Sequence, residues 1–158
     1  MSRKWIVVLS VLILTLVLVI PAAAINFGEP DNGEHPYVGI LVFYNSGGYW
    51  LWRCSGSLIS DRLIVTAGHC VSPDEDGRVP VSVRAYFDDT VDYDFVSNNF
   101  PKDGYYTGAF LPHPEWAWVT PFPETYDIGV VILDEPVEGI TEYAQLPELN
   151  FLDQIPNS

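Results

Sequence analysis

Apolar residues beyond position 24 occur in short runs separated by glycine, proline and polar residues. Val, Ile, Tyr, Phe and Trp dominate these runs, and none is long enough or spaced suitably for a helix. Six runs predict strands: Tyr37–Tyr44, Trp50–Ile59, Leu63–Thr66, Val79–Phe87, Gly108–Leu111 and Ile128–Leu133. Between the first two, Asn45-Ser46-Gly47-Gly48 has the composition of a hairpin turn. The pattern predicts an all-β domain, either a small barrel or a sandwich.

The one long apolar run lies at the amino terminus. WIVVLSVLILTLVLVI, residues 5–20, follows Arg3 and Lys4 and precedes Pro21 and three alanines. This order is typical of a secretory signal peptide, and the run is shorter than the roughly 20 residues of a membrane-spanning helix. We therefore expect residues 1–24 to be a signal peptide, the protein to be secreted to the extracellular space, and no stable membrane anchor.

The chain is strongly acidic, with 21 Asp and Glu residues against 7 Lys and Arg residues and a formal charge of −14. Removal of residues 1–24 would take away Arg3 and Lys4 and no acid, which leaves five basic residues. Such a surface repels nucleic acid and anionic lipid. A nucleic-acid partner is excluded, and solubility is sufficient to explain the charge.

Cys54 and Cys70 are the only cysteines. In an exported chain an even pair predicts a disulfide, which for a loop of this length stabilises the fold by about 3 kcal/mol. Cys70 follows His69 in the segment LIVTAGHC, so the bond would fix the turn that carries the imidazole. A histidine with a pKa near 6.5 suits proton transfer, although a single histidine is more often structural.

Asp127 stands at the beginning of YDIGVVIL, directly before an apolar run. A carboxylate at this place is costly to desolvate unless it has a partner. A histidine that acts as a general base needs a carboxylate on Nδ1 to hold its ring. The residues alone leave two interpretations open, a partner for His69 and a solvated loop acid.

Three segments together resemble one family. CSGSLIS, residues 54–60, followed by LIVTAGHC resembles the cysteine-to-histidine block of the trypsin-like serine endopeptidases, the chymotrypsin family. YDIGVVIL resembles the block that carries the catalytic aspartate of that family. HPEW, residues 113–116, resembles the His-Pro segment that precedes this block. The segments occur in the order of the family, and the resemblance covers nearly all of residues 26–150.

The resemblance implies the first six-stranded antiparallel β-barrel of the two-barrel trypsin fold, over residues 25–150, with 151–158 as a truncated inter-barrel linker. It implies a Ser-His-Asp triad that hydrolyses peptide bonds in polypeptide substrates, with His69 as the general base and Asp127 as the residue that orients it. No cofactor is implied. His113, in the His-Pro segment, and His35, in the loop before the first strand, are interpreted as structural.

The nucleophile of this family lies in a Gly-Asp-Ser-Gly-Gly segment of the second barrel, and residues 128–158 contain no such segment. Ser46 precedes Gly47-Gly48, but it lies ahead of His69 and follows no acid. We therefore expect the second barrel to be absent and the chain, as the N-terminal half of a serine endopeptidase, to be inactive alone. The alternative is a noncatalytic secreted half-domain that acts as a binding module or is completed by a second chain.

A calcium loop is a weaker possibility. Ser72–Val83 places Asp74, Asp76 and Gly77 at the third, fifth and sixth positions of such a loop, but Val83 stands where a bidentate acid is needed. Some members of the family bind calcium after the histidine block. A solvated acidic turn is the favoured interpretation.

The sequence also departs from the family in two respects. Gly68 and Gly129 stand where alanine is more common, and Ser55 where glycine is. No Lys or Arg occurs between Trp5 and Trp52, so the usual activating cleavage has no site there. We hypothesise that removal of the signal peptide itself frees Ile25 as the mature amino terminus.

Overall fold

The computed structural model describes residue 5, residues 31–88, 100–119 and 125–151, and residue 154. The chain divides into two units, residues 1–30 and 31–158, and the strands all belong to the second. The expected signal peptide, apart from Trp5, and the expected terminus at Ile25 lie outside the described residues. In the described part of the chain no helix has the length and apolar character needed to span a membrane.

Six strands and one short 3₁₀ helix make up the second unit: β1 (Val38–Tyr44), β2 (Trp50–Leu58), β3 (Leu63–Thr66), η1 (Gly68–Val71), β4 (Ser82–Tyr86), β5 (Gly108–Pro112) and β6 (Gly129–Leu133). All six predicted strands are confirmed, five of them to within one residue at each end. The prediction for β4 was wrong at its start, since residues 79–81 lie outside the strand. Pro80 lacks the N–H that a ladder requires, which explains the later start.

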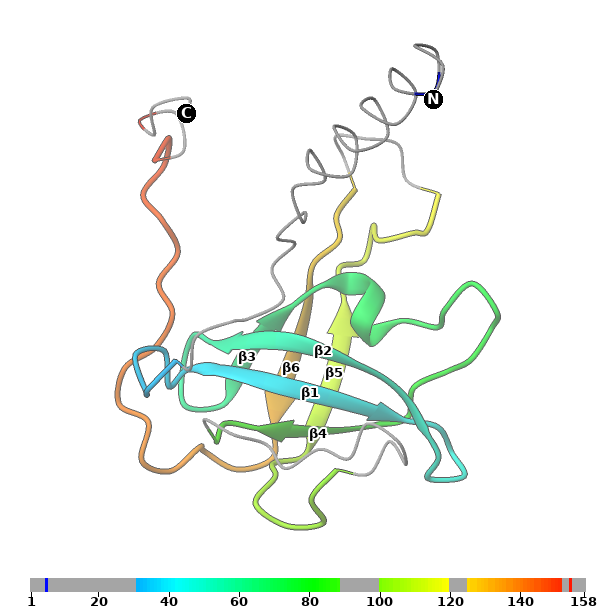
Figure 1. Cartoon of the computed structure of the whole chain (residues 1–158), viewed down its shortest axis with the longest axis horizontal. Coiled ribbons are helices and arrows are strands. Elements are labelled where there is room, and N and C mark those ends of the chain that lie inside the picture. Colours follow the sequence, from blue (N-terminus) through cyan, green and yellow to red (C-terminus); the bar gives the residue numbers. More distant parts are fainter. Residues whose placement is uncertain (1–4, 6–30, 89–99, 120–124, 152–153, 155–158) are drawn as a thin grey trace. The chain divides into compact units, whose positions relative to one another are not determined.

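The strands form one antiparallel sheet in the order β4-β1-β2-β3-β6-β5 (Figure 1). Ala85 in β4 and Tyr106, just before β5, exchange two backbone hydrogen bonds of 2.9 Å. Because these residues belong to opposite edges of the sheet, their pairing closes it into a barrel. The predicted all-β fold with a six-stranded antiparallel barrel is thereby confirmed.

The barrel interior is filled by aliphatic and aromatic side chains from every strand. Its largest members are fully buried: Phe43, Leu41, Leu58, Ile64, Val83 and Val131. A second, smaller cluster of Val42, Tyr86 and Phe100 covers the other face of β1. Since β1 is covered on both faces, its sequence VGILVFY is continuously apolar instead of alternating.

The β1–β2 turn has the predicted chemistry. The Oδ1 of Asn45 accepts hydrogen bonds from the N–H groups of Gly47 and Tyr49, at 2.9 and 3.0 Å. Gly48 has a φ of 73°, which a residue without a Cβ adopts at no steric cost. Ser46 is therefore part of a tight turn with its own structural explanation.

Strand pairing brings two distant segments to the same end of the barrel. Gly129, the first residue of β6, pairs with Thr66 at the end of β3 and with Pro112 at the end of β5. Helix η1 follows β3 after one residue, and Asp127 precedes β6 by two. His69 and Asp127 are therefore neighbours although 58 positions separate them.

Candidate active site

Helix η1, which carries His69, is held to its surroundings by several hydrogen bonds. The indole Nε1 of Trp52, in β2, donates to the carbonyl of Cys70 at 2.9 Å. The hydroxyl of Ser72 donates to the carbonyl of Gly68 at 2.7 Å. These bonds satisfy carbonyl groups of a helix too short to satisfy them itself. The backbone at His69 is consequently fixed on both sides of the residue.

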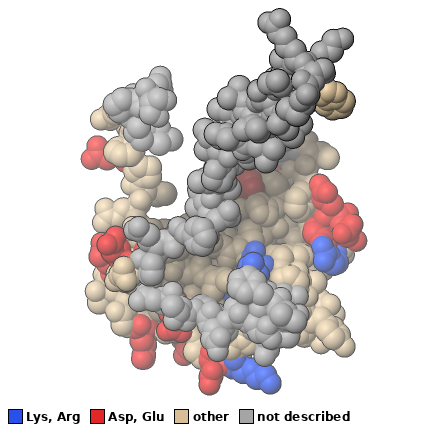
Figure 2. All heavy atoms as spheres, in the orientation of Figure 1, with Lys and Arg blue, Asp and Glu red and all other residues tan. Residues whose placement is uncertain are grey.

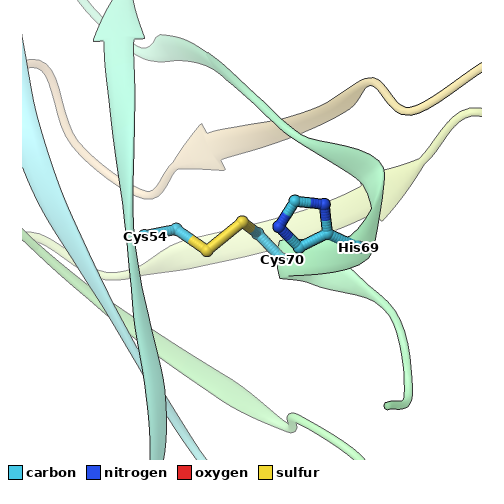
Figure 3. A group of neighbouring side chains, drawn as sticks. All are labelled: Cys54, His69 and Cys70. Atoms are coloured by element: carbon cyan, nitrogen blue, oxygen red, sulfur yellow. A yellow bond between two sulfur atoms is a disulfide. The ribbon is translucent and has the colours of Figure 1, made fainter. Parts of the chain in front are cut away.

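A disulfide joins Cys54 of β2 to Cys70 of η1 across a sequence separation of 16 residues, as predicted. Figure 3 shows the His69 imidazole beside this bond. One ligand atom from each of Cys54, His69 and Cys70 lies within 4.8 Å of the other two. A cysteine binds a metal ion as its thiolate, however, and the sulfurs of Cys54 and Cys70 are bonded to each other in the disulfide. The cluster therefore serves to hold η1 in place.

Asp127 contacts His69 at two points. Its Oδ1 accepts a hydrogen bond from the backbone N–H of His69, and its Oδ2 lies 2.8 Å from Nδ1 of the ring. An ionised carboxylate only accepts hydrogen bonds, so Nδ1 is the donor. In the neutral imidazole this leaves the Nε2 lone pair free to accept a proton. The arrangement therefore orients the ring so that Nε2 can accept a proton.

The charge on Asp127 is stabilised locally. Partial burial by itself raises the pKa of a carboxyl group, but hydrogen bonds from the backbone and ring of His69, and from the Gly68 backbone, outweigh it. The pKa of Asp127 is consequently below its ordinary value. About a third of the carboxylate side chain and nearly half of the imidazole are exposed, at 32% and 45%. Asp127 is therefore ionised at neutral pH while the ring stays accessible to a reacting group.

Two glycines allow η1 and the start of β6 to pack closely. A Cβ at Gly129 would lie 2.5 Å from Cγ2 of Val71 and 3.0 Å from the carbonyl oxygen of Ala67. A Cβ at Gly68 would lie 3.1 Å from the Ile128 carbonyl oxygen. The glycine at position 129 thus has a steric reason, which the sequence did not indicate. The close packing sets the distance between the His69 and Asp127 backbones.

Two tryptophans flank the imidazole. The ring centroids of Trp116 and Trp118 lie 6.3 and 6.2 Å from that of His69, and 5.5 Å from each other. The Nε1 of Trp118 donates to the carbonyl of Pro73 at 2.8 Å. Sequence reasoning assigned no role to either residue. No local pattern in the sequence indicates this contact, because the place of both residues beside His69 depends on the pairing of β5 with β6.

The other two histidines lie apart from this pair. His113 stacks on Tyr126 at 5.1 Å, and its backbone N–H bonds to the carbonyl of Ile128. His35 is an ion-pair partner of Asp31, which also accepts a hydrogen bond from its backbone N–H. This pair lowers the pKa of Asp31 and raises that of His35, chiefly through the side-chain hydrogen bond. Sequence reasoning missed the contact between His35 and Asp31, although the two residues are only four positions apart.

The acidic side chains of the segment considered for calcium, Ser72–Val83, contact Arg78 within the same segment. Asp74 accepts hydrogen bonds from Nε of Arg78 at 2.6 Å and from its backbone N–H at 2.8 Å. Asp76 lies 3.7 Å from the same guanidinium group. The carboxylates of this turn are therefore oriented toward an internal cation. A solvated acidic turn therefore stays the favoured interpretation of this segment, and calcium binding the weaker one.

Comparison with known proteins identifies the family. The trypsin family matches residues 25–151, which is most of the chain. The chain is 44% identical over 108 residues to the serine protease Hayan of Drosophila melanogaster, covering 66% of this chain and 15% of that protein. It is 30% identical over 110 residues to chymotrypsin-like elastase family member 1 of Rattus norvegicus, covering 70% and 37%. The chain belongs to the trypsin-like serine proteases of the chymotrypsin family.

Solved structures also match part of the chain. The structure titled "Structure of GrC" aligns with a TM-score of 0.48 and 22% identity, over 76% of this chain and 46% of that one. The chain thus spans less than half the length of these relatives.

Proposed function

We propose that this chain supplies the base half of a serine endopeptidase active site, with His69 as the general base and Asp127 as the residue that orients it. The observation that carries the proposal is that the two-point contact of the Asp127 carboxylate with His69 joins segments 58 residues apart, next to the Cys54–Cys70 disulfide, and orients a half-exposed imidazole. In peptide hydrolysis Nε2 of His69 would take the proton of a serine hydroxyl as that oxygen attacks the carbonyl carbon. Asp127 would stabilise the imidazolium that forms.

The nucleophile and the oxyanion-binding N–H groups belong, in our proposal, to a second barrel. Residues 128–158 contain no Gly-Asp-Ser-Gly-Gly segment, and Ser46 is accounted for by its turn. The second barrel is either a continuation of the same polypeptide or a separate chain. The 158 residues alone would then bind no serine-reactive probe and cleave no peptide.

The test is to treat the protein secreted by its source with a serine-reactive phosphonate and to measure its intact mass without reduction. The proposal requires that the probe labels either a species heavier than 17.7 kDa that contains this chain or a second chain that co-purifies with it, and that a His69→Ala variant abolishes the labelling. A folded species at or below 17.7 kDa that ignores the probe and co-purifies with no labelled chain would contradict it, and would favour a noncatalytic binding module.

We also propose that the protein is secreted. Supporting observations are the apolar run behind Arg3 and Lys4 and the disulfide, which persists in oxidising compartments. N-terminal sequencing of the secreted protein should begin at Ile25. A terminus upstream of Trp5 would show that the apolar segment is retained.

A further inference from the structure

A cavity of about 510 Å³ lies beside the barrel, away from the candidate active site. Its wall is formed by the segment after β4, the segment before β5 and the segment after β6. Cavities of roughly 300–1,000 Å³ are the size at which proteins bind small molecules or single side chains of a partner. This cavity is therefore large enough to hold a ligand group.

Strand pairing separates this cavity from His69. At the cavity end of the β5–β6 pair Gly108 lies opposite Leu133, and at the other end Pro112 lies opposite Gly129, next to Asp127. A five-residue strand spans roughly 13 Å. The cavity and the His69–Asp127 pair therefore lie at opposite ends of the same two strands. A ligand in the cavity would not occupy the catalytic position.

Three aromatic rings line the cavity: Phe87, Tyr105 and Tyr106. The Phe87 and Tyr106 rings meet edge to face at 6.2 Å, and the Tyr106 hydroxyl accepts a hydrogen bond from the Glu138 backbone N–H. The guanidinium carbon of Arg84 lies 4.5 Å from the Tyr105 ring centroid. One of these rings thus already contacts a cation within the protein, and the aromatic wall is held in place by its own contacts.

Three exposed carboxylates, those of Asp88, Glu135 and Glu138, share the cavity with these rings. In the part of the chain that the structure describes, no ion pair involves any of them. Among the described residues that line the cavity there is no Lys, Arg or His. Figure 2 shows acidic side chains at several places on the face in view and basic ones at few. Within the part of the chain that the structure describes, no ion pair therefore neutralises these three carboxylates.

We propose that this acidic aromatic cavity binds an alkylammonium or guanidinium group. Aromatic faces attract such cations through the ring quadrupole, and carboxylates add hydrogen bonds and charge. A neutral apolar ligand would displace water from the carboxylates without offering them a hydrogen bond, and an anion would be repelled. The combination selects for positive charge. This inference does not depend on the proposed peptidase activity.

The cation has two possible sources, a free amine and a Lys or Arg side chain of a polypeptide. A second cavity of about 240 Å³ shares Phe87 and Asp88 with the first and is otherwise lined by Val38, Pro36 and the ion-paired residues Asp31 and His35. The two together offer room for residues on both sides of a basic side chain. We therefore expect a polypeptide segment with a central Lys or Arg to bind more tightly than the free amine.

The test uses calorimetric titration of the full chain with three probes: a pentapeptide with a central lysine, the same peptide with norleucine in its place, and N-acetyl-lysine amide. The lysine peptide should bind and the norleucine peptide should not. Weaker binding of N-acetyl-lysine amide than of the lysine peptide would identify a polypeptide as the source, and equal binding a free amine. Equal binding of the lysine and norleucine peptides would overturn the proposal.

Matched variants separate the cavity from the overall charge. Replacement of Glu135 and Glu138 by Gln should weaken binding of the lysine peptide by about tenfold or more. The control replaces Glu75 and Glu148 by Gln, since these acids do not line the cavity and the change in charge is equal. Phe87→Leu keeps an apolar side chain but removes one ring, and should also weaken binding. Equal losses in the two double variants would show attraction to overall charge only and overturn the proposal.

Discussion

Asp127 binds both the backbone N–H and the ring Nδ1 of His69, each at 2.8 Å. Asp31 makes the same two contacts with His35, so this geometry alone does not distinguish a catalytic pair. The surroundings differ. The Asp31–His35 contact is local, whereas the Asp127–His69 contact joins segments 58 residues apart, next to a disulfide and two indole rings. Only the second pair is fixed by the fold.

Replacement of Asp127 by Asn should abolish the orientation of His69. Asn has one oxygen and one NH₂ group, so it can accept from only one of the two N–H groups of His69. With the oxygen on the backbone N–H, the NH₂ group donates to Nδ1 and favours the tautomer with its proton on Nε2, which cannot act as the base. In the active protein with its second barrel, kcat should fall by about 10⁴-fold. Kinetics on a peptide substrate would measure this. As a control, Asp103→Asn removes an exposed acid elsewhere and should leave kcat unchanged; an equal loss there would contradict the assigned role.

The pH dependence of stability should follow from the lowered pKa of Asp127. A carboxyl group whose pKa is lower in the folded than in the unfolded chain stabilises the fold above the unfolded value of about 3.9. This contribution is lost as the pH falls through the folded pKa, so the free energy of unfolding should decrease below about pH 4. Urea titrations at several pH values would measure it. Asp127→Asn should make the decrease shallower, and an unchanged slope would contradict the prediction.

Removal of the disulfide should destabilise the barrel. For a sequence separation of 16 residues, the chain-entropy model gives a loss of about 3 kcal/mol in the free energy of unfolding. The variant that replaces both Cys54 and Cys70 by Ala should show this loss in urea titration under oxidising conditions. The same loss should follow when the natural chain is reduced. If the double variant unfolds at the same urea concentration as the natural chain, the disulfide does not stabilise the barrel and the prediction is wrong.

The sequence predicts those parts of the fold and of the candidate site that depend on neighbouring residues, and misses those that depend on contacts between distant segments. The strands followed from apolar runs, and the β1–β2 turn from the residues Asn45–Gly48, because both depend on neighbouring residues. The contact of Asp127 with His69 followed only from the resemblance to a family, since its 58-residue separation gives no local signal. Trp116 and Trp118 were missed for the same reason. Their place beside His69 depends on how β5 and β6 pair.

Gly129→Ala should be unfavourable although alanine is common at this position in the family. The new Cβ would lie 2.5 Å from Cγ2 of Val71, closer than packed atoms approach. We expect a loss of about 1–3 kcal/mol in the free energy of unfolding. In a Val71→Ala background the same substitution should cost less, because the clashing methyl group is gone. Equal costs in the two backgrounds would show that the clash with Val71 is not the cause.

Trp52→Phe should loosen helix η1 while leaving the barrel core largely intact. The variant keeps an aromatic ring but loses the Nε1–H bond of 2.9 Å to the Cys70 carbonyl. We expect a loss of about 1 kcal/mol in stability and faster amide exchange at His69 and Cys70. Trp50→Phe is the matched control, because the buried Nε1 of Trp50 has no hydrogen-bond partner in the structure. That variant removes an indole from the same strand without removing a hydrogen bond, so exchange at His69 should not change. Equal acceleration in both variants would mean that ring packing, and not the hydrogen bond to Cys70, holds η1 in position.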